Sequence, residues 1–80
     1  MILPLSEKAQ HFKPGIYRHY KNKEYQAFFV ARQSEAVTEE VVVYQALADG
    51  HYWVRPLAMF LENVEVDGQN VPRFEWVRKE

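Results

Sequence analysis

Apolar and polar residues alternate in short runs along the chain, which predicts a series of β-strands. Residues 16–20 (IYRHY) and 24–32 (EYQAFFVAR) are rich in β-branched and aromatic residues, and a polar KNK stretch separates them. Asn tolerates a positive φ better than other non-glycine residues, so Asn22 is the expected turn residue. This hairpin places Tyr20 and Tyr25 opposite each other as an aromatic pair.

The run at residues 40–47 (EVVVYQAL) gives the strongest strand signal in the chain. It is apolar on both faces, so we expect it in the interior of the sheet. The polar residues 33–39 before it are predicted to form a loop, with a helical turn that begins at Ser34.

The Asp49-Gly50 pair predicts a turn into a fourth strand at residues 51–55 (HYWVR). After this strand, residues 56–61 (PLAMFL) are expected to form a tight turn of 3₁₀ type. That turn would place apolar side chains in the core, namely Leu57, Phe60 or Leu61.

The stretch NVEVDGQNV (residues 63–71) predicts the clearest hairpin, because Asp67-Gly68 fits a two-residue turn with both central φ angles positive. This register places Val64 opposite Val71 on one face.

The ends of the same hairpin are also informative. Continuing the register places Glu62 opposite Arg73 as an ion pair. Pro72 has no N–H to donate to a strand ladder, so we expect an edge strand with a bulge or bend at this point. The bend would turn Phe74 towards the core.

Together these elements predict an all-β fold. We expect a small, partly open SH3-like barrel of five to six short antiparallel strands, with a 3₁₀ turn and a short helical turn near residues 6–12. Eighty residues allow one domain. Its expected parts are an N-terminal extension (1–13), a single β-barrel domain (14–77) and a tail (78–80).

The chain contains no cysteine, which excludes disulfides, thiolate zinc sites and thiol nucleophiles. Small secreted domains usually need disulfides, and no segment resembles a signal-peptide core or a membrane span. We therefore expect a cytoplasmic protein without membrane association.

Residues that could carry catalysis are few. The three histidines (His11, His19 and His51) lack the spacing of a metal site, so we expect no metal and no cofactor. An enzyme that uses His19, Ser34 and Glu35 is the third functional hypothesis, because nothing places the histidine near the serine. No catalytic residue is assigned.

Aromatic and cationic residues share strand faces in two places, which favours a binding surface. The leading hypothesis is a non-catalytic binding module that recognises a peptide or a small anionic ligand. Its groove would be lined by Tyr17, His19, Arg32, Trp53 and Arg55. The competing interpretation is that Tyr17 and Trp53 serve only as core rings.

Charge is distributed unevenly along the chain. Residues 1–33 carry six Lys or Arg against two Glu, whereas residues 34–80 carry four against nine acidic residues. The second hypothesis is therefore RNA or single-stranded DNA binding by a basic first hairpin, although an isoelectric point near 6.3 does not indicate a strongly basic surface. The alternative is that oppositely charged halves attract each other. The candidate basic patch comprises Lys13, Arg18, Lys21, Lys23 and Arg32.

Several motifs occur in a recognisable order from Pro14 to Phe74: PGIYRHYK, KEY, VAR-x-SE, VVVYQAL, WVRPL-x-MF and VEVDG-x-x-VPRF. Together they resemble the bacterial family known as domain of unknown function 1653. The resemblance implies a short all-β bacterial protein and implies no biochemical role. This chain has Asn22 where the family turn usually has glycine, and Gln33 where a histidine is usual. Any chemistry of that histidine would be absent here.

Overall fold

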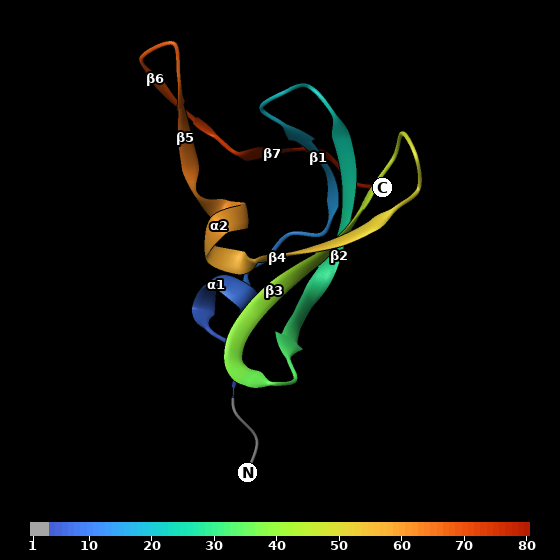
Figure 1. The fold of residues 1–80 in the computed structure, drawn as a ribbon, viewed down its shortest axis with the longest axis vertical. Coiled ribbons are helices and arrows are strands. Elements are labelled where there is room, and N and C mark those ends of the chain that lie inside the picture. The colour runs from blue at the N-terminus through green and yellow to red at the C-terminus, as the bar shows by residue number, and fades with distance from the viewer. Residues whose placement is uncertain (1–3) are drawn as a thin grey trace.

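The structure is a computed structural model that describes residues 4–80 (Figure 1). Within this range the chain forms seven strands and two short helices, which confirms the all-β class and exceeds the five to six strands expected. In chain order they are α1 (Glu7–Gln10), β1 (Gly15–His19), β2 (Glu24–Gln33), β3 (Ala36–Ala46), β4 (Tyr52–Pro56), α2 (Leu57–Leu61), β5 (Asn63–Val66), β6 (Gln69–Pro72) and β7 (Phe74–Arg78).

Five strands form one antiparallel sheet in the order β4-β3-β2-β1-β7, and β5 pairs with β6 in a separate sheet. Strand β3 has a neighbour on each side, as its apolar sequence predicts. The sheet is not closed into a barrel over residues 4–80, so the SH3-like arrangement stays a prediction. In this part of the chain no helix is long and apolar enough to cross a membrane.

The β1–β2 hairpin turns at Asn22, whose φ of 72° confirms the expected turn residue. The predicted pairing of Tyr20 with Tyr25 is wrong, because Tyr25 lies opposite Tyr17. Strand β1 ends at His19, and Tyr20 belongs to the turn. The backbone N–H of His19 donates to the carbonyl of Lys23 at 2.8 Å, which closes the turn one residue earlier than expected.

The predicted loop at residues 33–39 is also wrong. Strand β2 continues to Gln33 and β3 already begins at Ala36, so only a two-residue turn separates them. No helical turn begins at Ser34. The β-branched Val37 and Thr38 favour strand in this polar segment, and the register of the β2–β3 ladder shifts here, between Arg32 and Gln33.

The core lies between the curved five-stranded sheet and the two helices (Figure 1). Strand β3 contributes alternate side chains to it, including Val42 and Tyr44. At its centre the rings of Phe60 and Phe74 stack with centroids 4.2 Å apart. Phe60 is only 1% exposed, and its burial contributes roughly 3 kcal/mol.

Helix α2 supplies Phe60 and Leu57 to the core, while Leu61 remains 42% exposed. The element is a single α-helical turn rather than the expected 3₁₀ turn. Helix α1 confirms the predicted N-terminal helical turn, with the Ser6 hydroxyl accepting from the N–H of Ala9. Residues 1–3 of the expected N-terminal extension lie outside the described residues.

The β5–β6 hairpin projects from the rest of the molecule (Figure 1). Its turn has positive φ at Asp67 (50°) and Gly68 (80°), and Val64 lies opposite Val71, all as predicted.

The base of this hairpin holds the expected ion pair, with a nitrogen of Arg73 2.7 Å from a carboxylate oxygen of Glu62. After Pro72 the chain bends into β7, which leaves the hairpin and pairs with β1. This bend brings Phe74 into the core at 6% exposure, as predicted.

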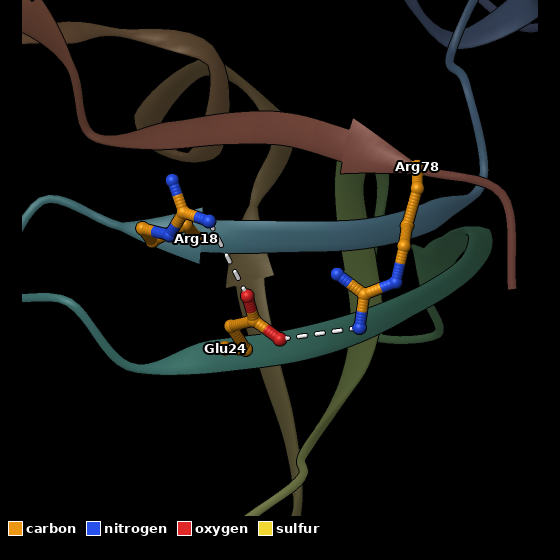
Figure 2. A network of polar contacts seen from close by, with 3 residues as sticks. All are labelled: Arg18, Glu24 and Arg78. Carbon is orange, nitrogen blue, oxygen red and sulfur yellow. Dashed lines mark hydrogen bonds and ion pairs between the residues drawn. The ribbon is translucent and has the colours of Figure 1, made fainter.

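Three neighbouring strands are joined by one carboxylate (Figure 2). Glu24 on β2 lies between two arginines, with its oxygens 3.5 Å from Arg18 on β1 and 3.3 Å from Arg78 on β7. The charge of Arg18 is therefore balanced within the fold.

Candidate functional site

The β3–β4 ladder places an aromatic and a cationic residue on one face of the sheet. Trp53 lies directly opposite Tyr44, and Arg55 lies opposite Val42. Residues two apart in a strand share a face, so Trp53 and Arg55 point to the same side. They line a cavity of about 230 Å³ together with Tyr25 and Tyr44. Trp53 is 51% exposed, so it forms the outer wall.

Arg55 is held by aromatic groups. Its Nε donates to the hydroxyl of Tyr44 at 3.2 Å, and its guanidinium carbon lies 5.5 Å from the ring centroid of Phe74. The side chain is partly buried, and over residues 4–80 no carboxylate forms an ion pair with it. The hydrogen bond to Tyr44 uses Nε alone, so both terminal nitrogens can donate to a carboxylate or phosphate.

His19 also packs against Phe74, edge to face, with the ring centroids 4.9 Å apart. Its Nδ1 accepts from the backbone N–H of Lys21 at 3.2 Å, which requires a neutral ring with the proton on Nε2. Burial lowers the pKa of His19, and the nearby charges of Arg55, Arg73 and Lys21 lower it further. At neutral pH the imidazole is therefore a hydrogen-bond donor at Nε2 without a charge of its own.

Arg73 adds a second guanidinium to this region. Its Nη2 pairs with Glu62, whereas its Nε is buried without a hydrogen-bond partner. The charges of Arg55 and Arg73 each lower the pKa of His19, so each guanidinium lies within electrostatic range of the imidazole. The site therefore combines aromatic rings with the guanidinium of Arg55, which forms no ion pair with a carboxylate of residues 4–80.

A larger cavity, about 400 Å³, lies between the β1–β2 turn and the β5–β6 hairpin. His19 contributes to the lining of this larger cavity. The wall is mixed, because Arg18 is offset by the acidic groups of Asp67 and Glu75. The charges of this wall therefore largely offset one another.

Two of the five residues proposed from the sequence lie elsewhere. Tyr17 is 6% exposed, and its hydroxyl donates to the carbonyl of Lys13 at 2.6 Å. Burial raises the pKa of Tyr17 to about 12. Arg32 donates to the carbonyl of Val37 at 2.9 Å, beside the β2–β3 turn. The structure thus brings His19, Trp53 and Arg55 to one region, while Tyr17 packs in the core and Arg32 lies at the far end of β2.

Sequence reasoning did not include Tyr25, Tyr44, Arg73 and Phe74 in the site. The position of Tyr44 could not have been found from the Asp49-Gly50 pair, because a two-residue turn there would place Ala46 opposite Trp53, whereas the observed register places Tyr44 there. The place of Tyr25 could not have been found either, since its ladder to β3 contains a shift between Ala27 and Phe29.

The catalytic grouping of His19, Ser34 and Glu35 is not assembled. His19 ends β1 beside the first turn, whereas the other two form the turn at the opposite end of the ten-residue strand β2. At about 3.3 Å per residue those ends are roughly 30 Å apart. Over residues 4–80 no cluster of three or more His, Cys, Asp or Glu side chains could hold a metal ion.

The candidate basic patch is likewise divided. Arg18 pairs with Glu24, and Arg32 lies at the other end of the sheet. The Lys13 ammonium lies 3.4 Å from the ring centroid of Trp76. Only the turn lysines, Lys21 and Lys23, remain together on the first hairpin.

Comparison with known proteins supports the resemblance in the sequence motifs. The family model "Protein of unknown function (DUF1653)" matches residues 15–76. A crystal structure of a DUF1653 protein from Bordetella bronchiseptica is 37% identical, with a TM-score of 0.82, over 90% of this chain and 95% of that chain. No curated protein matches. The family match spans most of the chain and a similar fold accompanies it, so the chain belongs to the DUF1653 family.

Proposed function

We propose that this protein is a non-catalytic binding module that takes an anionic group, a carboxylate or a phosphate, at Arg55. The observation that carries the proposal is the environment of that guanidinium. It is partly buried on the ring of Phe74, it is oriented by Tyr44, and it has no carboxylate partner over residues 4–80.

A partly buried guanidinium that has no anionic partner carries a desolvation cost that no ion pair offsets. Burial removes part of its hydration, and arginine side chains in such places are normally paired. A carboxylate or phosphate could accept two parallel hydrogen bonds from the terminal nitrogens. Each hydrogen bond to a charged group contributes roughly 1.5–3 kcal/mol, so one bidentate contact supports measurable affinity.

The surrounding residues fit the same role. Trp53 is 51% exposed beside the guanidinium and offers an apolar surface to the rest of a ligand. The Nε2–H of His19 is a second donor, whereas the charge of Arg73 is paired with Glu62. An anion near Arg55 would therefore meet the guanidinium and a neutral imidazole donor.

We also propose a cytoplasmic location and an SH3-like arrangement of the strands. A cytoplasmic location is supported by the absence of cysteine. An SH3-like arrangement is supported by a four-strand meander, β1 to β4, followed by a last strand that pairs back with β1. Domains of that architecture commonly bind ligands, which is an analogy of fold and not of site.

The test is a titration of the protein with inorganic phosphate and with succinate, followed by the NMR signals of the Trp53 indole and the Arg55 side chain. Arg55→Lys keeps the charge but loses the planar fork, so we expect affinity to fall at least about 10-fold. Arg55→Ala should abolish saturable shifts.

The matched control is Arg78→Ala, which removes the same charge from an exposed side chain on β7. It should bind like the unaltered protein. The proposal is overturned if no anion gives saturable shifts, or if Arg55→Lys and Arg78→Ala bind equally well. Dispersed NMR spectra of each variant establish that it is folded.

A further inference from the structure

We propose that the anionic group is carried by an extended peptide strand that pairs with the open edge of β4. This rests on the proposed function, because it identifies the class of molecule that brings the anion to Arg55. The peptide would add a sixth strand beside β4, with an acidic side chain directed at the guanidinium.

Strand β4 is an outer strand of the five-stranded sheet and pairs only with β3. The N–H of Ala46 donates to the carbonyl of His51 at 2.9 Å, so these two residues form a hydrogen-bonded pair at the start of the β3–β4 ladder. Hydrogen-bonded pairs alternate along antiparallel strands, so Trp53 and Arg55 direct their backbone groups towards β3. Tyr52 and Val54 therefore direct their N–H and C=O groups to the open edge.

This edge is exposed and carries little that would prevent pairing. Tyr52, Trp53 and Val54 are 67%, 51% and 63% exposed. Proteins usually protect sheet edges with charged residues, prolines or bulges, and β4 has Arg55 and, at its last position, Pro56. An acidic residue on an added strand would pair with the charge of Arg55, and an exposed sheet edge is the feature that peptide-binding domains use for strand addition.

Charge complementarity indicates what the added strand carries. Among residues 52–56, Arg55 is the only charged residue. A peptide residue opposite Arg55 would occupy a non-hydrogen-bonded pair, in which side chains approach most closely. An acidic residue at that position would meet the terminal nitrogens of the guanidinium. A second copy of β4 would instead bring another arginine and no carboxylate.

The opposite face of β4 adds a further preference. Tyr52 and Val54 point away from the Arg55 site, and the ring of Phe28 lies 6.0 Å from that of Tyr52. Phe29, opposite Val43 on the neighbouring strand pair, is 57% exposed. The peptide residues that flank the acidic one would face this apolar surface. The structure therefore favours a segment that reads apolar–acidic–apolar.

The experiment measures binding of acetylated, amidated nonapeptides with a central glutamate and varied apolar flanking residues, by fluorescence polarisation. Two altered versions of each peptide are compared with it. One has glutamine in place of glutamate, and the other has N-methyl groups on the backbone nitrogens that would face β4. We expect each alteration to reduce affinity at least about 10-fold.

On the protein, Val54→Pro removes the N–H that faces the open edge and leaves the ladder to β3 intact. It should reduce peptide affinity about 10-fold while phosphate still binds at Arg55. Val54→Ala is the matched control, since it shortens the side chain but keeps the N–H, and it should lose less affinity.

The outcomes separate the two proposals. If phosphate binds in an Arg55-dependent manner but no peptide does, or if N-methylated peptides bind equally well, strand addition is overturned and the anion site stands. If neither phosphate nor peptide binds, both proposals fail. A dimer in light scattering that Val54→Pro dissociates would overturn the peptide in favour of a second copy.

Discussion

The hydroxyl of Tyr44 accepts a hydrogen bond from Nε of Arg55 at 3.2 Å, between side chains on adjacent strands. Tyr44 is a core residue at 4% exposure, whereas Arg55 reaches the surface. The core therefore fixes the orientation of the guanidinium, and a ligand does not have to order it. This preorganisation is a condition for tight anion binding.

Tyr44→Phe tests that relationship. It removes the acceptor and leaves the ring, so we expect a loss of about 1 kcal/mol in the free energy of unfolding and a several-fold lower affinity for phosphate. Urea denaturation and the phosphate titration measure the two effects. Tyr52→Phe removes the same atom from a ring that is 67% exposed, and it should change neither quantity. Equal effects of the two variants would contradict the positioning role of Tyr44.

Gly15→Ala is expected to destabilise the protein by roughly 2–4 kcal/mol. Gly15 has φ of 144°, and an added Cβ would lie 2.6 Å from Nε1 of Trp76 and 2.7 Å from the carbonyl oxygen of Arg78. The start of β1 would then be pushed away from β7. Urea denaturation followed by circular dichroism measures the change.

The control for Gly15 is Gly68→Ala. Gly68 also has positive φ, at 80°, but its added Cβ would meet nothing within 4 Å. Only backbone strain remains, so the expected loss is about 1 kcal/mol. If Gly68→Ala were as damaging as Gly15→Ala, close packing against Trp76 would not be the cause.

The sequence predicted best where local chemistry decides the structure. Asn22 and Asp67 adopt the positive φ angles that their turns require, and the register of the last hairpin follows from its two-residue turn. Prediction from the sequence failed where pairing between strands decides the structure. Most of the polar segment from Gln33 to Glu39 becomes strand, with only residues 34 and 35 as a turn, because β3 extends along β2, and no local signal reports that partner.

The same limit applies to the candidate site. Alternation correctly placed Trp53 and Arg55 on one face, but it could not reveal which face is buried on β1. Tyr17 therefore looked like a groove residue, although it packs edge-on against Phe60 with ring centroids 5.1 Å apart. Phe74 enters the site only because β7 returns to pair with β1, a contact between distant parts of the chain.

His19 is expected to make stability depend on pH. Burial, aided by the charges of Arg55 and Arg73, holds its folded pKa below the ordinary value of 6.5. The unfolded chain therefore binds the proton more readily, so the stabilising contribution is present above pH 6.5 and is lost as pH falls through the folded pKa. Unfolding free energies measured between pH 7.5 and 5 should decrease.

His19→Asn isolates this effect. Its side-chain oxygen can still accept from the N–H of Lys21, but it does not titrate in this range. The decrease in stability between pH 7.5 and 5 should be smaller than in the unaltered protein. His11 and His51 are exposed and present in both proteins, so their contribution cancels. Parallel pH profiles would show that His19 is not the group responsible.

Glu40 is expected to control the attachment of α1 in acid. Its carboxylate accepts from the hydroxyl of Ser6 at 2.6 Å and from the Ser6 backbone N–H at 2.8 Å, and these hydrogen bonds hold the pKa of Glu40 below its ordinary value of 4.5. The resulting stabilisation is present above pH 4.5 and is lost as pH falls through the folded pKa.

Glu40→Gln should flatten the dependence of Tm on pH between 5.5 and 3, whereas Glu39→Gln, at the adjacent exposed carboxylate, should leave it unchanged. Equal slopes in the two variants would mean that the contact with Ser6 does not couple α1 to β3.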